Sequence, residues 1–140
     1  MQAKETFLQV MAEQQEIALA TSVGGQPNVR IVNFIYLPET KCVYFSTFKG
    51  NDKVGELRAN DKVAFTTIVS DGDSSHVRVL EGVARESELS LQELAVPLIE
   101  KFPFYKEIID HGADEMLVIE IHFDNAVLIT GMESRVEIAN

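Results

Sequence analysis

Residues 28–37, with the sequence NVRIVNFIYL, form the stretch that decides the fold. β-Branched and aromatic side chains dominate it, which predicts a β-strand. An antiparallel strand with one face in water alternates apolar and polar residues, but this strand is apolar on both faces. We therefore expect its outer face to be covered by a helix or, as we favour, by a second copy of the chain. The two faces carry Val29, Ile31, Ile35 and Leu37 on one side, and Val32, Phe34 and Tyr36 on the other.

Short turns separate the strands predicted on either side of this stretch, and short turns favour antiparallel pairing. Gly82 indicates a bulge, residues 70–75 a polar loop, and Asp124-Asn125 the turn of a hairpin. No strong signal follows Glu133. About seven strands in so short a chain predict a closed or nearly closed barrel. The predicted strands are residues 17–23, 28–37, 42–48, 62–69, 76–86, 116–123 and 126–132.

Helical segments are additions to this sheet. Ser90 and Glu93 match a capping box at the start of one of them, Pro97 predicts a kink or break inside it, and Gly112 indicates the end of the next. The sequence thus predicts a single, mainly β domain over residues 1–140. The predicted helices are residues 4–14, 53–59, 90–102 and 104–110.

The composition restricts the partners that the protein can have. Its 140 residues carry a formal net charge of −10, which repels nucleic-acid backbones and anionic membranes. The single cysteine, Cys42, lies in an apolar run and is interpreted as a buried, inert thiol. The histidines His76, His111 and His122 lack metal-ligand spacing. Because the sequence shows neither a signal peptide nor a membrane span, we expect a cytoplasmic protein that binds no metal, nucleic acid or membrane.

The stretch with the most specific chemistry is residues 44–53, YFSTFKGNDK. A strand ends in the hydroxyls of Ser46 and Thr47, and a helix follows with Lys53 in its first turn. Backbone N–H groups at a helix start bind anions, and an anion there would offset the repulsion between a lysine and the positive end of the helix dipole. Arg30 could reach the same anion with a bidentate fork. The alternative is a solvated turn whose lysine faces water.

Several stretches together resemble the pyridoxamine 5′-phosphate oxidase-like FMN-binding split-barrel superfamily. They are PNVRIVNF (27–34), VYFST (43–47), KVGEL (53–57), NDKVAF (60–65) and HVRVLEGVA (76–84). The resemblance is clear over residues 15–86 and rests on element order elsewhere. It implies an antiparallel Greek-key split β-barrel and a homodimer with one FMN in each of two interface clefts.

The resemblance also implies roles for individual residues. Arg30 and Lys53 would hold the FMN phosphate, with Ser46 and Thr47 beside it. The isoalloxazine ring would meet Val32 and Asn33, partly through backbone groups, and His76 would approach the flavin. No catalytic residue is assigned. The complete set of expected cofactor-binding residues is Arg30, Ile31, Val32, Asn33, Phe45, Ser46, Thr47, Asn51, Lys53 and His76.

Two features separate the chain from the true oxidases of that superfamily. Residues 131–138, GMESRVEI, lack the arginine- and serine-rich ending that helps to hold the pyridoxal substrate, so vitamin B6 oxidation is not expected. The helical insert, residues 90–112, is similar to those of the nitroimidazole-reductase-like and general-stress branches.

Two functions stay open at this point. One is an FMN-dependent oxidoreductase acting on a small aromatic or quinone-like compound, in which the flavin does the chemistry and the protein binds and orients it. The other is a non-enzymatic carrier or sensor of flavin or haem, with His76, His111 or His122 as an axial haem ligand. A deazaflavin in place of FMN also stays open.

Overall fold

The computed structural model describes residues 2–69, 75–131 and 134–140, which form one antiparallel sheet of nine strands with four α-helices. This is the mainly β architecture with helical additions that the sequence predicts. The predicted polar loop lies, except for Ser75, outside the described residues. The strands are β1 Glu16–Val23, β2 Gln26–Asn33, β3 Ile35–Leu37, β4 Cys42–Phe48, β5 Lys62–Thr67, β6 His76–Glu86, β7 Met116–His122, β8 Asn125–Thr130 and β9 Ser134–Ala139. The helices are α1 Gln2–Glu13, α2 Asp52–Ala59, α3 Ala95–Lys101 and α4 Tyr105–Gly112, followed by a 3-10 turn at Ala113–Glu115.

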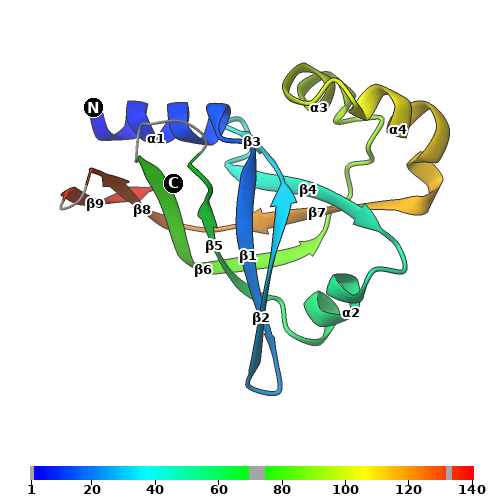
Figure 1. Cartoon of the computed structure of the whole chain (residues 1–140), viewed down its shortest axis with the longest axis horizontal. Coiled ribbons are helices and arrows are strands. Elements are labelled where there is room, and N and C mark those ends of the chain that lie inside the picture. The colour runs from blue at the N-terminus through cyan, green and yellow to red at the C-terminus, as the bar shows by residue number, and fades with distance from the viewer. Residues whose placement is uncertain (1, 70–74, 132–133) are drawn as a thin grey trace.

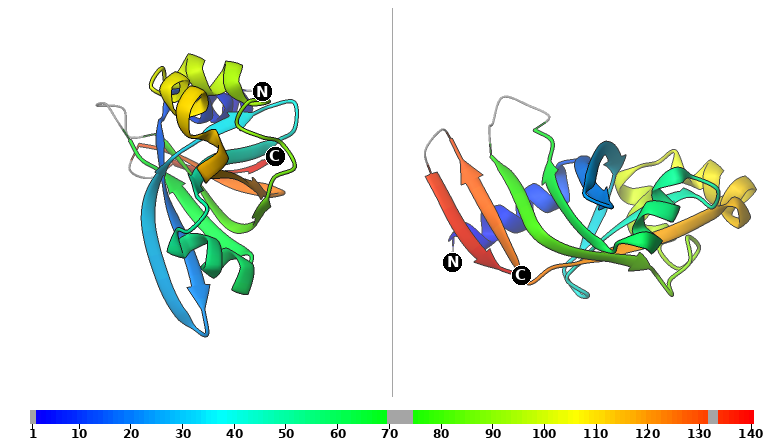
Figure 2. Two further views of the ribbon diagram at one scale, coloured as in Figure 1. Left: turned by 90° about the vertical axis from the view of Figure 1, so that its right-hand side faces the viewer. Right: turned by 90° about the horizontal axis from the view of Figure 1, so that it is seen from below.

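The sheet follows the order β2-β1-β5-β6-β7-β4-β3, and β8 joins it by pairing with β6 and β9. It curls without closing, with α1 at one side and α2 beside the β1–β2 hairpin (Figure 1). Helices α3 and α4 lie together at the end of the molecule opposite the β8–β9 hairpin (Figure 2). Within the described part of the chain, no helix is long and apolar enough to cross a membrane.

The predicted strand 28–37 is divided into β2 and β3 at Phe34. Strand β2 pairs with β1, whereas β3 pairs with β4, so the chain passes from one end of the sheet to the other at this residue. The Phe34 N–H donates to the Gln15 carbonyl at 3.1 Å, and its ring is buried in the main core. The prediction of one continuous strand was therefore wrong, because the periodicity of a sequence does not show where the chain leaves one neighbouring strand and pairs with another.

The predicted hairpin across Asp124-Asn125 was also wrong. Strands β7 and β8 both run along β6, β7 against residues 83–86 and β8 against residues 76–78. The chain keeps its direction across this junction and reverses later, where Gly131 has a φ of 70° and leads into β9. Strand β9 gave no sequence signal because it buries only one residue, Ile138.

The bulge expected near Gly82 is confirmed. Val63 pairs with Gly82 and Phe65 with Val79, so Leu80 and Glu81 together oppose the single residue Ala64. The extra residue reverses the alternation of β6, which turns Leu80 and Glu81 both toward the exposed side.

The helical insert forms, but it begins later than predicted. Ser90 and Glu93 make the capping box, with the Glu93 N–H donating to Ser90 Oγ at 3.1 Å, yet the α-helix starts at Ala95. Pro97 consequently lies in the first turn, where a missing N–H costs nothing, and it causes no kink or break. Helix α4 ends at Gly112 as expected.

Two apolar cores lie on opposite faces of the sheet. The main core fills the concave side and includes Phe7, Phe34 and Phe45. The second core packs α3 and α4 against the outer face of β3, β4 and β7, and the members of β4 are Cys42 and Tyr44. Helices, not a second copy of the chain, therefore cover the outer face of β4. On β2 the outer face is bare, with Val29 64% and Ile31 59% exposed.

Candidate anion-binding site at helix α2

Helix α2 connects two parts of the sheet that are far apart in strand order. Asn51 caps its start, with Oδ1 accepting from the Lys53 N–H at 3.0 Å. Lys53 and Glu56 are spaced i, i+3 and therefore share a face of the helix. The carboxylate of Glu56 reaches β1 and β2, and the ammonium of Lys53 reaches β4.

Glu56 holds the arginine that the sequence singles out. Arg30 donates from Nη2 to Glu56 Oε1 at 2.5 Å and from Nη1 to Thr21 Oγ1 at 2.9 Å. Glu56 also accepts from Thr21 Oγ1 at 2.7 Å and from Asn28 Nδ2 at 3.1 Å. These hydrogen bonds, first those of Thr21 and Asn28 and then that of Arg30, lower the pKa of Glu56. The carboxylate neutralises the charge of Arg30. Without it, the partial burial of that charge would be energetically costly.

Lys53 has no such carboxylate. Its Nζ donates to Thr47 Oγ1 at 3.0 Å, and no ion pair of Lys53 occurs among the described residues. Burial lowers the pKa of Lys53, Arg30 lowers it further by repulsion, and Glu56 acts in the opposite direction. An anion placed between the two cations would relieve both unfavourable effects.

The charges and the helix end together favour a bound anion. Of the two carboxylates of α2 near these cations, Glu56 pairs with Arg30, and the exposed Asp52 in the first turn pairs with neither cation. Lys53 is therefore left without a direct counter-ion among the described residues. The first-turn N–H groups of α2 lie at the same place, and helix N-termini attract anions. Thr47, which is only 3% exposed, adds a hydroxyl that can donate. The structure thus brings together Arg30, Thr47, Asn51 and Lys53 of the predicted set.

Two other predicted residues of β4 lie elsewhere. Successive side chains of a strand point to opposite faces, so Ser46 faces the helical layer, where its Oγ lies 2.6 Å from the Tyr105 hydroxyl. Phe45 is 1% exposed and belongs to the main core. Neither side chain is beside Lys53, which corrects the expectation that both hydroxyls, Ser46 and Thr47, face one anion.

The residues expected near a flavin ring are divided between the two faces of β2. Val32 packs against the main core, whereas Ile31 is 59% exposed on the outer face. Asn33 is half-buried at the end of the strand. His76 begins β6, and β1 and β5 lie between it and β2 in the sheet. The fold of one chain therefore does not bring His76 to Arg30.

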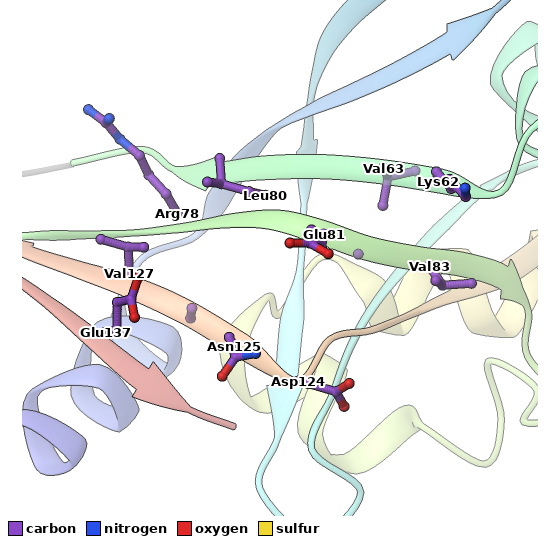
Figure 3. Close-up of a pocket in the computed structure, with 12 residues that line it drawn as sticks. Lys62, Val63, Arg78, Leu80, Glu81, Val83, Asp124, Asn125, Val127 and Glu137 are labelled. Carbon is purple, nitrogen blue, oxygen red and sulfur yellow. The ribbon is translucent and has the colours of Figure 1, made fainter.

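A groove of about 610 Å³ lies on another part of the surface, along β6 and the start of β8 (Figure 3). Lys62 and Arg78 line it together with the acids Glu81, Asp124 and Glu137. Because acids outnumber bases there, this groove suits an anion less well than the start of α2 does. None of the predicted cofactor residues lines it.

Sequence reasoning missed Glu56, Thr21 and Asn28. A signal for Glu56 existed, since an acid three residues after Lys53 falls on the same helix face. The polar residues Thr21, Asn28 and Arg30 could not be grouped from the sequence. Their grouping depends on the pairing of β1 with β2, in which Thr21 lies opposite Asn28 and Leu19 opposite Arg30.

Comparisons with known proteins place this chain in a family. The family model described as pyridoxamine 5′-phosphate oxidase-like matches residues 10–135, whereas no curated protein matches the sequence. General Stress Protein 26 from Bacillus anthracis is similar in structure, with a TM-score of 0.73 and 19% identity over 99% of this chain and 100% of that one.

Two further solved structures of similar fold are of cofactor-binding proteins. A heme binding protein from Mycobacterium smegmatis has a TM-score of 0.77 and 16% identity over 98% of this chain, which spans 57% of that one. An FAD-binding protein from Mesorhizobium loti has a TM-score of 0.63 and 18% identity over 88% of this chain and 89% of that one. At these identities the likeness concerns the fold alone, and it confirms the split-barrel class that the sequence predicts. With its family model matched over residues 10–135, the chain belongs to the pyridoxamine 5′-phosphate oxidase-like family.

Proposed function

We propose that the protein is a cytoplasmic flavoprotein that binds FMN by its terminal phosphate at the start of α2. The observation that carries this proposal is the meeting of Arg30, Thr47 and Lys53, which come from separate elements, beside a helix N-terminus where Lys53 has no ion-pair partner among the described residues. Phosphate oxygens accept hydrogen bonds from all of these donors. Deletion of any one donor should therefore weaken binding.

The residues at this place fit a phosphate ester. Arg30 would share its guanidinium between Glu56 and the phosphate, because it offers more donors than one carboxylate can accept. Lys53 would gain the counter-charge that it lacks, which would raise its lowered pKa. Thr47 would donate its hydroxyl while accepting from Lys53.

The flavin ring would extend along β2 to the interface of a homodimer. Strand β2 is at the end of the sheet and pairs only with β1 among the described strands, so its second edge can offer backbone groups to a ring. Its outer face exposes Val29 and Ile31. Burial of each such side chain contributes about 1.5–3 kcal/mol of favourable free energy. A second copy of the chain would bury them and enclose the flavin ring.

We further propose that the bound flavin serves an oxidoreductase acting on a small aromatic or quinone-like compound. Bound FMN supplies hydride or electron transfer. The residues of the chain bind and orient it, and none is assigned to a proton-transfer step. Because one protein of similar fold binds FAD and another binds haem, FAD and haem are the competing ligands.

The test is a titration with FMN that follows the change in flavin absorbance and fluorescence. We expect Lys53→Ala to bind FMN at least about tenfold more weakly, because losing a charge-assisted phosphate contact costs about 1.5–3 kcal/mol. Lys49→Ala is the matched control, since Lys49 precedes the same helix but is exposed. Riboflavin, which lacks the phosphate, should bind equally to both variants.

Equal FMN affinity of wild type and Lys53→Ala would remove Lys53 from the site. A Soret band with haemin, together with no response to FMN, would favour the haem alternative. Bleaching of bound flavin by NADH or NADPH would separate an enzyme from a carrier, which would leave the flavin oxidised.

A further inference from the structure

A second cluster of chemically reactive side chains lies on the outer face of the sheet, next to the helical layer. Cys42 begins β4, and Glu120 and His122 end β7. Their ligand atoms all lie within 4.8 Å of one another. We propose that Cys42, Glu120 and His122 bind a divalent transition-metal ion of the Zn²⁺ type.

The pairing of β4 with β7 produces this cluster. Tyr44 lies opposite Glu120, and Val43 lies opposite Ile121, so the register places Cys42 beside His122. Glu120 and His122 are two residues apart and therefore point to the same face of β7. No sequence spacing links residue 42 with residues 120–122, which explains why the single cysteine and the scattered histidines predicted no metal site.

The separation between the sulfur and nitrogen atoms is that of a tetrahedral site. Zn–S bonds of about 2.3 Å and Zn–N bonds of about 2.0–2.1 Å place sulfur and nitrogen about 3.5 Å apart at a tetrahedral angle. Cys42 Sγ lies 3.4 Å from His122 Nδ1 and 3.7 Å from His122 Nε2. Glu120 Oε2 is in direct hydrogen-bond contact with His122 Nε2. Coordination by both groups needs only a small outward movement of the carboxylate.

The donor set selects the kind of ion. Thiolate and imidazole favour Zn²⁺ and similar ions over Mg²⁺ and Ca²⁺, which require oxygen ligands. Three protein ligands with a fourth position left for water or substrate match an open zinc site. On binding, the proton of the Cys42 thiol and any proton shared by His122 and Glu120 are released to solvent, and the metal ion takes the place of these protons.

The neighbours of the cluster support such a site and leave it accessible. Arg85 contacts Glu120 at 3.2 Å and His122 at 3.0 Å, but its side chain is 65% exposed and can turn into water when a cation enters. Ser87 donates to Glu120, as outer partners of metal ligands commonly do. His122 is 39% exposed on its side chain, so an ion can reach the buried Cys42 from this side.

The alternative explanation is an ion-pair and hydrogen-bond network without a metal, and a titration with Co²⁺ and Zn²⁺ separates the two. The full chain, reduced and freed of metal by a chelator, is titrated with Co²⁺. We expect a thiolate-to-cobalt charge-transfer band at one equivalent, with visible bands of four-coordinate intensity. Addition of Zn²⁺ should remove both, because Zn²⁺ binds such ligands more tightly than Co²⁺.

Variants assign the ligands. Cys42→Ser should lose the charge-transfer band, and His122→Gln and Glu120→Gln should each weaken Co²⁺ binding by about tenfold or more. His111→Gln is the matched control, because His111 is exposed on α4 beside Glu107, outside the cluster. Circular dichroism checks that each variant is folded. If Cys42→Ser proves unfolded, the half-exposed His122 provides the decisive variant.

The proposal is overturned if the folded wild type gives no charge-transfer band, or if His122→Gln and His111→Gln bind Co²⁺ equally. It does not rest on flavin binding. Lys53→Ala should leave the Co²⁺ spectrum unchanged, and His122→Gln should leave the response to FMN unchanged, so that failure of one proposal can be told from failure of the other.

Discussion

Strands β2 and β4 both place apolar side chains on the outer face of the sheet, but their surroundings are opposite. The outer face of β4 is covered by α3 and α4, whereas the outer face of β2 exposes Val29 and Ile31. The difference teaches that apolar residues on an outer face predict a covered strand without indicating what covers it. For β4 the cover is in the chain itself, and for β2 we propose that it is a second copy.

A truncation in the helical layer that covers β4 should have the largest effect, which is on the free energy of unfolding. Phe102 is 3% exposed in the second core, so Phe102→Ala should lower the free energy of unfolding by about 3–5 kcal/mol. Phe104→Ala is the control, because Phe104 is 51% exposed and loses only its ring contacts with Phe102 and Tyr105, worth about 1 kcal/mol. Urea unfolding measures both. Equal losses would mean that α3 and α4 do not stabilise β4.

A substitution on the exposed outer face of β2 should give the next largest effect. This effect concerns the association of two chains and not the folding of one. Ile31→Lys should weaken a homodimer by about 3 kcal/mol, since a two-fold interface contains each substitution twice. That corresponds to roughly a hundredfold rise in the dimer Kd, measured by analytical ultracentrifugation. Val96→Lys, at a site 77% exposed on α3, is the control. A dimer as strong in Ile31→Lys as in wild type would exclude β2 from the interface.

The two faces of β4 itself predict a smaller, sharper contrast. Thr47 contacts Lys53, whereas Ser46 contacts Tyr105 in the helical layer. Thr47→Ala should therefore weaken FMN binding by about 1 kcal/mol, roughly fivefold, and Ser46→Ala should leave it unchanged. The same flavin titration measures both. Weaker binding in Ser46→Ala alone would reverse the assignment of the two hydroxyls.

The junction between β2 and β3, at Phe34, should give the smallest effect. Lys101 of α3 lies over the Phe34 ring at 4.0 Å, and burial lowers the pKa of Lys101 from 10.5 to about 8. Between these two pH values the unfolded chain binds more protons than the folded chain, so this lysine makes stability rise with pH there. In Lys101→Met that contribution is absent.

The quantity to measure is the difference in the free energy of unfolding between Lys101→Met and wild type. From pH 8 to 10.5 that difference should change in favour of wild type. Linkage sets about 3 kcal/mol as the upper limit for a fall in pKa from 10.5 to about 8, and solvent contact of the partly exposed Lys101 keeps the change well below that limit. Comparing the two proteins at each pH cancels the tyrosines and Cys42, which titrate at high pH in both. A difference that is constant over this range would contradict the lowered pKa.

Local patterns in the sequence were enough to predict most of the helices and strands. Strands β4 and β6 begin and end where periodicity predicts, and α2 starts at Asp52, one residue before the predicted Lys53. These features depend on neighbours in the chain, so a sequence shows them. Arg30, Thr47 and Lys53 were also predicted to share a site, because their residue types and the resemblance to the family coincide.

Long-range pairing decided the rest. The partner change at Phe34, the course of β7 and β8 along β6, and the strand β9 all depend on contacts between residues distant in sequence. The same is true of Glu56 beside Arg30 and of Cys42 beside His122. Residue types and local periods determined what each strand could be. Only the folded sheet determined which strand it meets, which face is covered and which polar groups meet, because these depend on register and curvature that no local pattern encodes.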